Sequence, residues 1–274
     1  MTDISKIDYS ALDRPEVTMF LFHPRAGLRM SEWDVFIPTE GNVIVGGRFH
    51  IAEKTAPNIL FFHGNGEIVG DYDDVAQLYN EKAINFLPVD YRGYGRSTGR
   101  PTVTAMMRDC HVIFDFTKKW LKENGCSGPL IIMGRSLGSA SALEIAAHYK
   151  DQIAGLIIES GFAYARPLLQ LLGINVQALG LKDEEGFRNA DKIRDVEKPV
   201  LVIHAEHDHI IPFSDGQSLY DSCQSDDKTL LKIPGANHND ILLHGLSEYM
   251  AAIKTLADKT GFLNSQNFGD DISV

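Results

Sequence analysis

The chain has 274 residues, 44% of them hydrophobic and 23% charged, a globular composition that suits one large α/β domain or two small ones. Its formal net charge is −11. An acidic surface repels phosphate groups, so the composition argues against proteins that bind nucleic acid or anionic lipid.

Buried strands alternate with helices along most of the chain. Residues 33–52 alternate in polarity around Glu40-Gly41-Asn42 and predict an antiparallel hairpin. Apolar runs typical of buried strands follow at 58–64, 84–95, 130–133, 153–161, 199–208 and 228–238. Helices are predicted at 72–83, 102–123, 140–147 and 243–258. This alternation predicts an α/β fold with a mostly parallel central sheet and helices on both faces, and the residues after Phe262 are expected to be frayed or loosely docked.

One serine stands where an apolar strand meets a helix, in the stretch IIMGRSLGSASALEIAA (131–147). Glycine and serine are common in ordinary turns. The spacing Gly134-x-Ser136-x-Gly138 is also the one that a sharp strand-to-helix turn needs when it lifts a serine off the end of a strand. The backbone at that serine is strained, and side chains at the two glycine positions would collide with the neighbouring strand or helix. We therefore interpret Ser136 as a nucleophile.

A serine hydroxyl is a weak nucleophile that needs a base, and the base needs a carboxylate behind it. Asp208 follows the strand PVLVIHAEH, and His238 follows the strand and turn LLKIPGANH, so both fall on the same edge of the sheet as Ser136. We predict a triad of these three residues. Asp208 is preferred as the acid because the turn after its strand points it at the histidine loop. Three other carboxylates compete for that role: Glu206, Asp240 and Glu159.

The tetrahedral intermediate of acyl transfer carries a negative oxygen that needs hydrogen-bond donors. The backbone N–H of Leu137, the residue after the nucleophile, is the first expected donor. The second is expected from the turn HGNGE (63–67), where Asn65 is preferred over Gly66. His63 is expected to hold this turn rather than to transfer protons.

The sequence predicts no metal site and no cofactor. His204 and His207 in HAEHDH are three residues apart on an extended chain, where successive side chains alternate in direction. The glycines of HGNGEIVG and GYGRSTG lack the spacing of a dinucleotide-binding loop, so neither a nicotinamide nor a flavin is indicated.

Several features favour a cytoplasmic protein without stable membrane insertion. The first residues, MTDISKIDYSALDRPEV, lack the pattern of a signal peptide. No apolar run approaches the roughly 20 residues that cross a bilayer. The three cysteines are scattered without a CxxC spacing, so neither a disulfide framework nor a zinc site is expected.

Over nearly the whole chain, five stretches of the sequence resemble the α/β-hydrolases of the Bem type. They are FFHGNGE, VDYRGYGRSTGRPT, MGRSLGSASALEIA, DKIRDVEKPVLVIHAEHDHIIPFSDGQSLYDSC and IPGANHND. This family includes eukaryotic enzymes that remove palmitoyl groups from proteins. The resemblance implies an α/β-hydrolase fold and places nucleophile, acid and base on Ser136, Asp208 and His238, in the family's chain order. The depalmitoylating members carry a cysteine-rich, lipidated N-terminus, whereas this sequence has no cysteine before Cys110.

We expect a single domain over 1–274 with a small cap insertion at about 162–195. The leucine-rich stretch RPLLQLLGINVQALGL lies within the insertion. Leu168, Leu172 and Leu179 are expected to line an acyl pocket. The alternative is an ordinary helix that packs these leucines on the sheet.

Four arginines follow strand ends on the edge that carries Ser136: Arg92, Arg96, Arg100 and Arg135. Arg92 and Arg96 are expected to pair with Asp90, Glu159 or Glu67 and to brace the loops. Arg135 stands beside the nucleophile, so we expect it to bind an anionic group of the substrate.

The predicted function is a serine hydrolase that cleaves a carboxylic ester or thioester of a small-molecule acyl substrate through an acyl-enzyme. A serine peptidase or amidase is one alternative. A non-catalytic binding protein that keeps the same fold is another. The sequence leaves the oligomeric state open.

Overall fold

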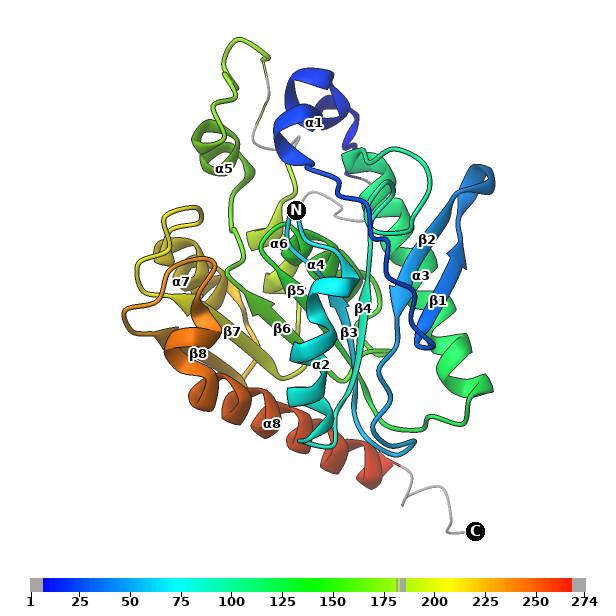
Figure 1. Cartoon of the computed structure of the whole chain (residues 1–274). Coiled ribbons are helices and arrows are strands. Elements are labelled where there is room, and N and C mark those ends of the chain that lie inside the picture. The colour runs from blue at the N-terminus through cyan, green and yellow to red at the C-terminus, as the bar shows by residue number, and fades with distance from the viewer. Residues whose placement is uncertain (1–6, 181, 183–185, 268–274) are drawn as a thin grey trace.

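The computed structural model describes residues 7–180, 182 and 186–267, with backbone only for 262–267. Within this part, eight strands form one sheet in the order β1-β2-β4-β3-β5-β6-β7-β8 (Figure 1). The strands are β1 (Asp34–Pro38), β2 (Ile44–Arg48), β3 (Asn58–Phe62), β4 (Asn85–Val89), β5 (Leu130–Arg135), β6 (Gly155–Glu159), β7 (Val200–Ala205) and β8 (Lys228–Ile233).

The sheet is parallel from β4 to β8 and antiparallel at its N-terminal edge. β3 pairs in parallel with β4 and β5, and β6, β7 and β8 continue that direction. β2 runs antiparallel to both β1 and β4, and a 3₁₀ turn at Glu40–Asn42 joins β1 to β2. The predicted hairpin and the predicted mostly parallel sheet are confirmed. In a parallel sheet the carboxyl ends of the strands share one edge, which is where ligands bind.

Helices cover both faces of the sheet (Figure 1). They are α1 (Pro15–Leu21), α2 (Asp73–Asn80), α3 (Val103–Glu123), α4 (Gly138–His148), α5 (Ala165–Leu171), α6 (Asn189–Arg194), α7 (Phe213–Ser222) and α8 (Ile241–Asn267). In β5, Ile131 and Met133 join a buried cluster with residues of α2 and α8. Ile132, between them, joins the cluster formed with α3, α4 and α6. Alternate residues of one strand thus build two cores, because successive side chains point to opposite faces.

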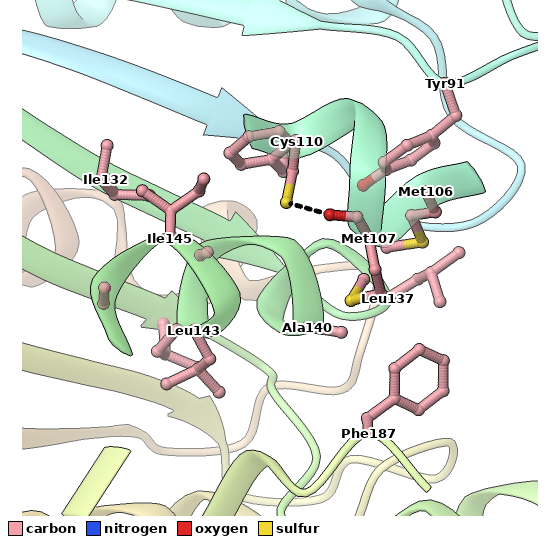
Figure 2. Close-up of a cluster of buried hydrophobic side chains, with 14 of the residues drawn as sticks. Tyr91, Met106, Met107, Cys110, Ile132, Leu137, Ala140, Leu143, Ile145 and Phe187 are labelled. Atoms are coloured by element: carbon pink, nitrogen blue, oxygen red, sulfur yellow. Dashed lines mark hydrogen bonds between the residues drawn. The ribbon is translucent and has the colours of Figure 1, made fainter. Parts of the chain in front are cut away.

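Helix α4 is enclosed on all sides. All its residues from Gly138 to Ala147 are buried. Figure 2 shows Ala140, Leu143 and Ile145 of α4 near side chains of α3, such as Met107 and Cys110. A helix built mostly of small and apolar residues, with no solvent-facing polar stripe, belongs in a core rather than at a surface. The segment that carries Ser136 is therefore held by packing along its whole length.

Helix α3 begins and ends where the sequence predicts. The Thr102 hydroxyl accepts a hydrogen bond from the Ala105 N–H at 3.1 Å, which satisfies one of the backbone donors at the start of the helix. Gly125 follows the last turn with a φ of +72°, a conformation that glycine adopts without strain.

Some helices differ from the prediction. The last helix starts at Ile241 and continues to Asn267, beyond the predicted end at 258. Its final turns, KTGFLNSQN, are mostly polar and carry no clear helical periodicity. The expectation of a frayed or loosely docked tail after Phe262 falls mostly on residues 268–274, which lie outside the described residues. Helices α1 and α7 are not among the helices predicted from the sequence. In α7 only Gly216 and Leu219 are buried, so the apolar stripe that identifies a surface helix is nearly absent.

The described residues of the segment 162–195 form two helices with different surroundings. The second helix of this segment, α6, contacts α4 and buries Asn189, Ala190, Lys192 and Ile193. It therefore belongs to the body of the fold. The first helix of this segment, α5, lies beyond the carboxyl edge of the sheet, near α1 (Figure 1).

Candidate active site

Ser136 lies in a strained turn between β5 and α4. Its φ is +51°, in the left-handed region that residues other than glycine rarely adopt. A Cβ atom on Gly134 would lie 2.3 Å from the carbonyl oxygen of Gly138, and a Cβ on Gly138 would lie 2.0 Å from that of Phe62. Both distances are shorter than real contacts, so the two glycines allow the tight approach of turn, helix and β3 that the motif predicts.

Ser136, His238 and Asp208 form one hydrogen-bonded chain. The Nε2 atom of His238 lies 3.1 Å from the Ser136 hydroxyl oxygen. The Nδ1 atom of the same ring lies 2.7 Å from Oδ2 of Asp208. All three residues are buried. The distances suit a proton that moves between the hydroxyl and the imidazole while the carboxylate orients the ring.

Asp208 is held as a carboxylate. Its Oδ1 accepts hydrogen bonds from the backbone N–H groups of Ile210 and Ile211, at 3.0 and 2.8 Å. Burial opposes ionisation, but the hydrogen bond and charge of His238 and these N–H groups outweigh it, so the pKa of Asp208 is lowered. An ionised Asp208 can stabilise an imidazolium at His238.

The competing carboxylates have other partners. Glu206 accepts from the N–H of Gly235, and Asp240 accepts from the N–H of Asn237. Glu159 accepts from the Tyr249 hydroxyl and pairs with an arginine at 3.0 Å. The geometry thus favours Asp208 over each of these three as the partner of His238.

The turn after β3 lies beside the serine. Asn65 and Leu137 line the same pocket as Ser136 and His238. Leu137 is the N-cap residue of α4, where backbone N–H groups have no acceptor within the helix. Gly66 is not among the residues that line this pocket, which favours Asn65 over Gly66 as the second donor.

His63 is buried at the base of this turn. Its Nδ1 lies 2.7 Å from the carbonyl oxygen of Gly64, and its Nε2 lies 3.2 Å from Oδ1 of Asp90. Both contacts are with the turn and the neighbouring strand end, as expected for a residue that holds the turn.

A pocket of about 220 Å³ opens at the serine. Leu168 and Leu172 of the α5 region line it, as predicted, together with two residues that the sequence analysis missed, Leu21 and Ile210. Ile210 lies two residues after Asp208 and could have been found from that position; nothing near Leu21 signals a role. Leu179 does not line this pocket: it is partly buried against the main core, and its carbonyl accepts from Arg14. The prediction for Leu179 is wrong.

Arg135 braces the site, and the prediction that it binds an anionic substrate group is not supported. Its guanidinium contacts Glu67 at 2.5 Å and Glu159 at 3.0 Å, and it donates to the carbonyl oxygen of His238 at 2.8 Å. Only 12% of the side chain is exposed. Its donors are directed at the turn after β3, the end of β6 and the histidine loop, because β5 ends among them. Arg135 therefore ties the elbow to the turn after β3 and to the histidine loop.

Replacement of Arg135 by glutamine is expected to lower the free energy of unfolding by about 3 kcal/mol, because it leaves the buried Glu159 and the half-buried Glu67 without their cation. Denaturant unfolding measures this loss. Arg108, which pairs with Glu40 at the exposed surface, provides the matched control: Arg108→Gln is expected to cost about 1 kcal/mol or less. Arg135→Gln should also lower hydrolysis of neutral and anionic esters alike. If a stable Arg135→Gln variant lost activity only toward anionic esters, the prediction that Arg135 binds an anionic substrate group would be supported again.

Two of the other arginines also brace loops, with different partners from those expected. Arg92 forms two hydrogen bonds with Asp109 of α3. Arg96 pairs with Asp34 of β1 at 2.9 Å. Asp109 is 17 positions from Arg92, and Asp34 is 62 positions from Arg96, so the fold brings each acid to its arginine.

The described residues contain one cluster of metal-ligand type, made by His111, Glu144 and His148 on α3 and α4. Glu144 is engaged by Lys192 at 2.6 Å and by the Tyr9 hydroxyl at 2.8 Å. Burial opposes its ionisation, yet hydrogen bonds from His111, Lys192 and Tyr9 lower the pKa of Glu144 to about 2. These contacts describe an ion-pair network around a buried lysine.

The histidines of HAEHDH are not brought together. His204 is buried, with its Nε2 2.8 Å from the carbonyl oxygen of Ile211, whereas the side chain of His207 is 69% exposed.

The sheet has eight strands, a serine elbow follows β5, and the histidine that contacts this serine follows β8. This arrangement defines an α/β-hydrolase. The comparison with protein families agrees: the model described as serine aminopeptidase, S33, matches residues 53–181 and 185–243. The chain belongs to this family of hydrolases.

Curated relatives show the same class. The chain is 32% identical over 216 residues to human alpha/beta hydrolase domain-containing protein 17B, a match that covers 73% of this chain and 67% of that protein. It is 28% identical to protein bem46 of Schizosaccharomyces pombe, over 69% of this chain and 64% of that protein. The match thus spans about two thirds of the length of these relatives.

Solved structures share the fold. An esterase of Pyrococcus furiosus, Pf2001, superimposes with a TM-score of 0.70 at 19% identity, covering 87% of this chain and 98% of the other. A soluble variant of monoglyceride lipase from Saccharomyces cerevisiae, in complex with a substrate analog, gives 0.66 at 17% identity, covering 88% and 99%. Among the helices of the described residues, none has the length and apolar character needed to cross a membrane.

Proposed function

We propose that this protein is a serine hydrolase that cleaves carboxylic esters or thioesters of small-molecule acyl substrates. The observation that carries the proposal is the hydrogen-bonded chain from Ser136 through His238 to Asp208, placed at the mouth of a leucine-lined pocket. Similarity to proteins named esterase and lipase supports the same reaction class.

The reaction follows from the positions of the donors and acceptors. Ser136 Oγ attacks the acyl carbonyl carbon, and its proton passes to Nε2 of His238. The N–H groups of Leu137 and Asn65 would donate to the resulting oxyanion. When the intermediate collapses, His238 gives the proton to the departing alcohol or thiol. Water activated by His238 then attacks the acyl-enzyme, releases the acid and restores the Ser136 hydroxyl.

Peptide hydrolysis is the second candidate because the matching family is described as serine aminopeptidase. An aminopeptidase needs an anionic group for the substrate's terminal ammonium. Among the described residues lining the pocket, Glu67 is the one carboxylate. Its Oε1 accepts from Arg135, and its Oε2 accepts from the Gly64 N–H and the Tyr72 hydroxyl, both at 2.6 Å. A saturated carboxylate is a poor ammonium receptor, so the pocket favours a neutral acyl group.

A fluorophosphonate probe and a substrate panel test the proposal. The probe should label wild-type protein covalently at Ser136. Neutral p-nitrophenyl esters or acyl-coenzyme A thioesters should be hydrolysed faster than aminoacyl amides. Folded protein that neither reacts with the probe nor turns over any of these substrates would be a binding protein with an α/β-hydrolase fold. Faster cleavage of the aminoacyl amides would make it a peptidase.

We also propose that the whole chain is one domain in which α5 forms a small cap over the pocket. Leu168 and Leu172 contribute to the pocket from this region, and Leu21 faces them from α1. The cap we propose is shorter than the insertion expected from the sequence, because α6 packs on α4.

Polar substitution in α5 is expected to change the preferred acyl length. Leu168→Asn or Leu172→Asn should lower the ratio of kcat/KM for octanoyl over acetyl esters roughly tenfold, since each buried methylene contributes about 0.8 kcal/mol. Leu179→Asn is the matched control and should leave the ratio unchanged. An equal loss of stability in all three variants, with no change in chain-length preference, would instead assign these leucines to the core.

A further inference from the structure

A segment before the hairpin crosses the candidate active site. We define the N-terminal strap as residues 9–25, which include α1 and lie outside the region matched by the family model. Leu21 of the strap lines the pocket that holds Ser136. Two residues further along, His23 reaches the turn after β3.

His23 and Asn65 are joined at two points. The backbone N–H of His23 donates to Oδ1 of Asn65 at 2.8 Å. The Asn65 amide nitrogen, which can only donate, lies 2.7 Å from Nδ1 of His23. The Tyr94 hydroxyl donates to the same Oδ1 at 2.7 Å. The side-chain amide of Asn65 is therefore held by groups outside its own turn, while its backbone N–H is not part of these contacts.

The strap itself is fixed on both sides of α1. At its start, the Tyr9 hydroxyl donates to Glu144 at 2.8 Å and accepts from Lys192 at 2.9 Å, and Tyr9 is 7% exposed. At its end, Arg25 pairs with Asp71 at 2.7 Å. A strap anchored to the body of the fold can transmit its position to the turn that it contacts.

We propose that His23 is a positioning residue of the hydrolase: the strap clamps the side chain of Asn65 so that its backbone N–H points to the site of the oxyanion. This inference rests on the proposed function. A preorganised donor stabilises the transition state without reorganising during the reaction. The clamp thus acts on the rate of the chemical step and hardly on substrate binding in the ground state.

Substitutions that remove the clamp keep the donor, because the donor is a backbone group. Asn65→Ala is expected to lower kcat about tenfold to a hundredfold, less than the 10²–10³ for complete removal of an oxyanion donor, with little change in KM. His23→Ala should lower kcat less, because its backbone N–H remains. The double variant should be no slower than Asn65→Ala, since both changes remove the same interaction. Met19→Ala, at an exposed position of the strap, is the control and should match wild type.

Hydrogen exchange tests the clamp independently of catalysis. Amides of residues 63–67 should exchange about tenfold faster in His23→Ala than in wild type or Met19→Ala, with the rest of the protein unchanged. If the turn keeps wild-type exchange in both His23→Ala and Asn65→Ala, the clamp is disproved, whether or not the protein hydrolyses esters. Faster exchange with wild-type kcat would also overturn the positioning role. Absence of ester turnover in wild type, with the probe unreactive, would instead refute the proposed function.

Discussion

Replacing Ser136 or His238 by alanine is expected to abolish ester hydrolysis while leaving the fold intact. In serine hydrolases that use a triad, loss of either residue lowers kcat by roughly 10⁶, because without the pair neither attack nor proton transfer proceeds. Steady-state kinetics on the best p-nitrophenyl ester measures the loss. Fluorophosphonate labelling should disappear with Ser136→Ala.

Two matched controls separate this effect from damage to the structure. Ser214→Ala replaces an exposed serine of α7, and His207→Ala replaces an exposed histidine; both should keep wild-type turnover. Thermal unfolding should show that all four variants remain folded. Retention of full activity in Ser136→Ala would refute the assignment of the nucleophile.

Asp208→Asn is expected to lower kcat by about 10⁴. The asparagine amide can place a donor where His238 needs an acceptor, which favours the wrong tautomer and removes the charge that stabilises the imidazolium. Glu206→Gln and Asp240→Asn are the matched controls, since each of these acids caps a backbone N–H in the same region. Both should remain active.

The opposite pattern would reassign the acid. If Asp208→Asn stayed active while Glu206→Gln or Glu159→Gln lost turnover, the hydrogen bond between His238 and Asp208 would not be the one used in catalysis. Glu159→Gln also disturbs the pair with Arg135, so its activity must be compared at equal stability.

The sequence predicts features of this fold that depend on local pattern. The elbow glycines, the buried strands and the Thr102-to-Gly125 helix each carry their signal within a few residues, and the structure contains them. The position of Asp208 and His238 on one edge follows from the rule that parallel strands share an edge. Local patterns and one topological rule were sufficient for these features.

Other features depend on contacts between distant segments. Arg135 pairs with one acid from the turn after β3 and one from the end of β6, and neither is near it in sequence. Its position beside Ser136 therefore suggested a substrate contact that the folded structure does not support. Leu21 lines the pocket although its segment carries no motif. Leu179 shares the leucine-rich pattern of its neighbours but lies elsewhere, since a pattern of leucines does not specify which core they join.

The burial of α4 from Gly138 to Ala147 has a consequence for protein engineering. Most of its residues are small, including Ser139, Ala140, Ala142 and Ala146, and each is enclosed by backbone or side chains. Larger residues have no free volume there, so we expect random mutagenesis of this helix to yield mainly destabilised variants. The evolvable part of the enzyme is its periphery, where α1 and α5 contribute to the pocket wall. New substrate ranges are best sought by diversifying those two helices around an unchanged centre.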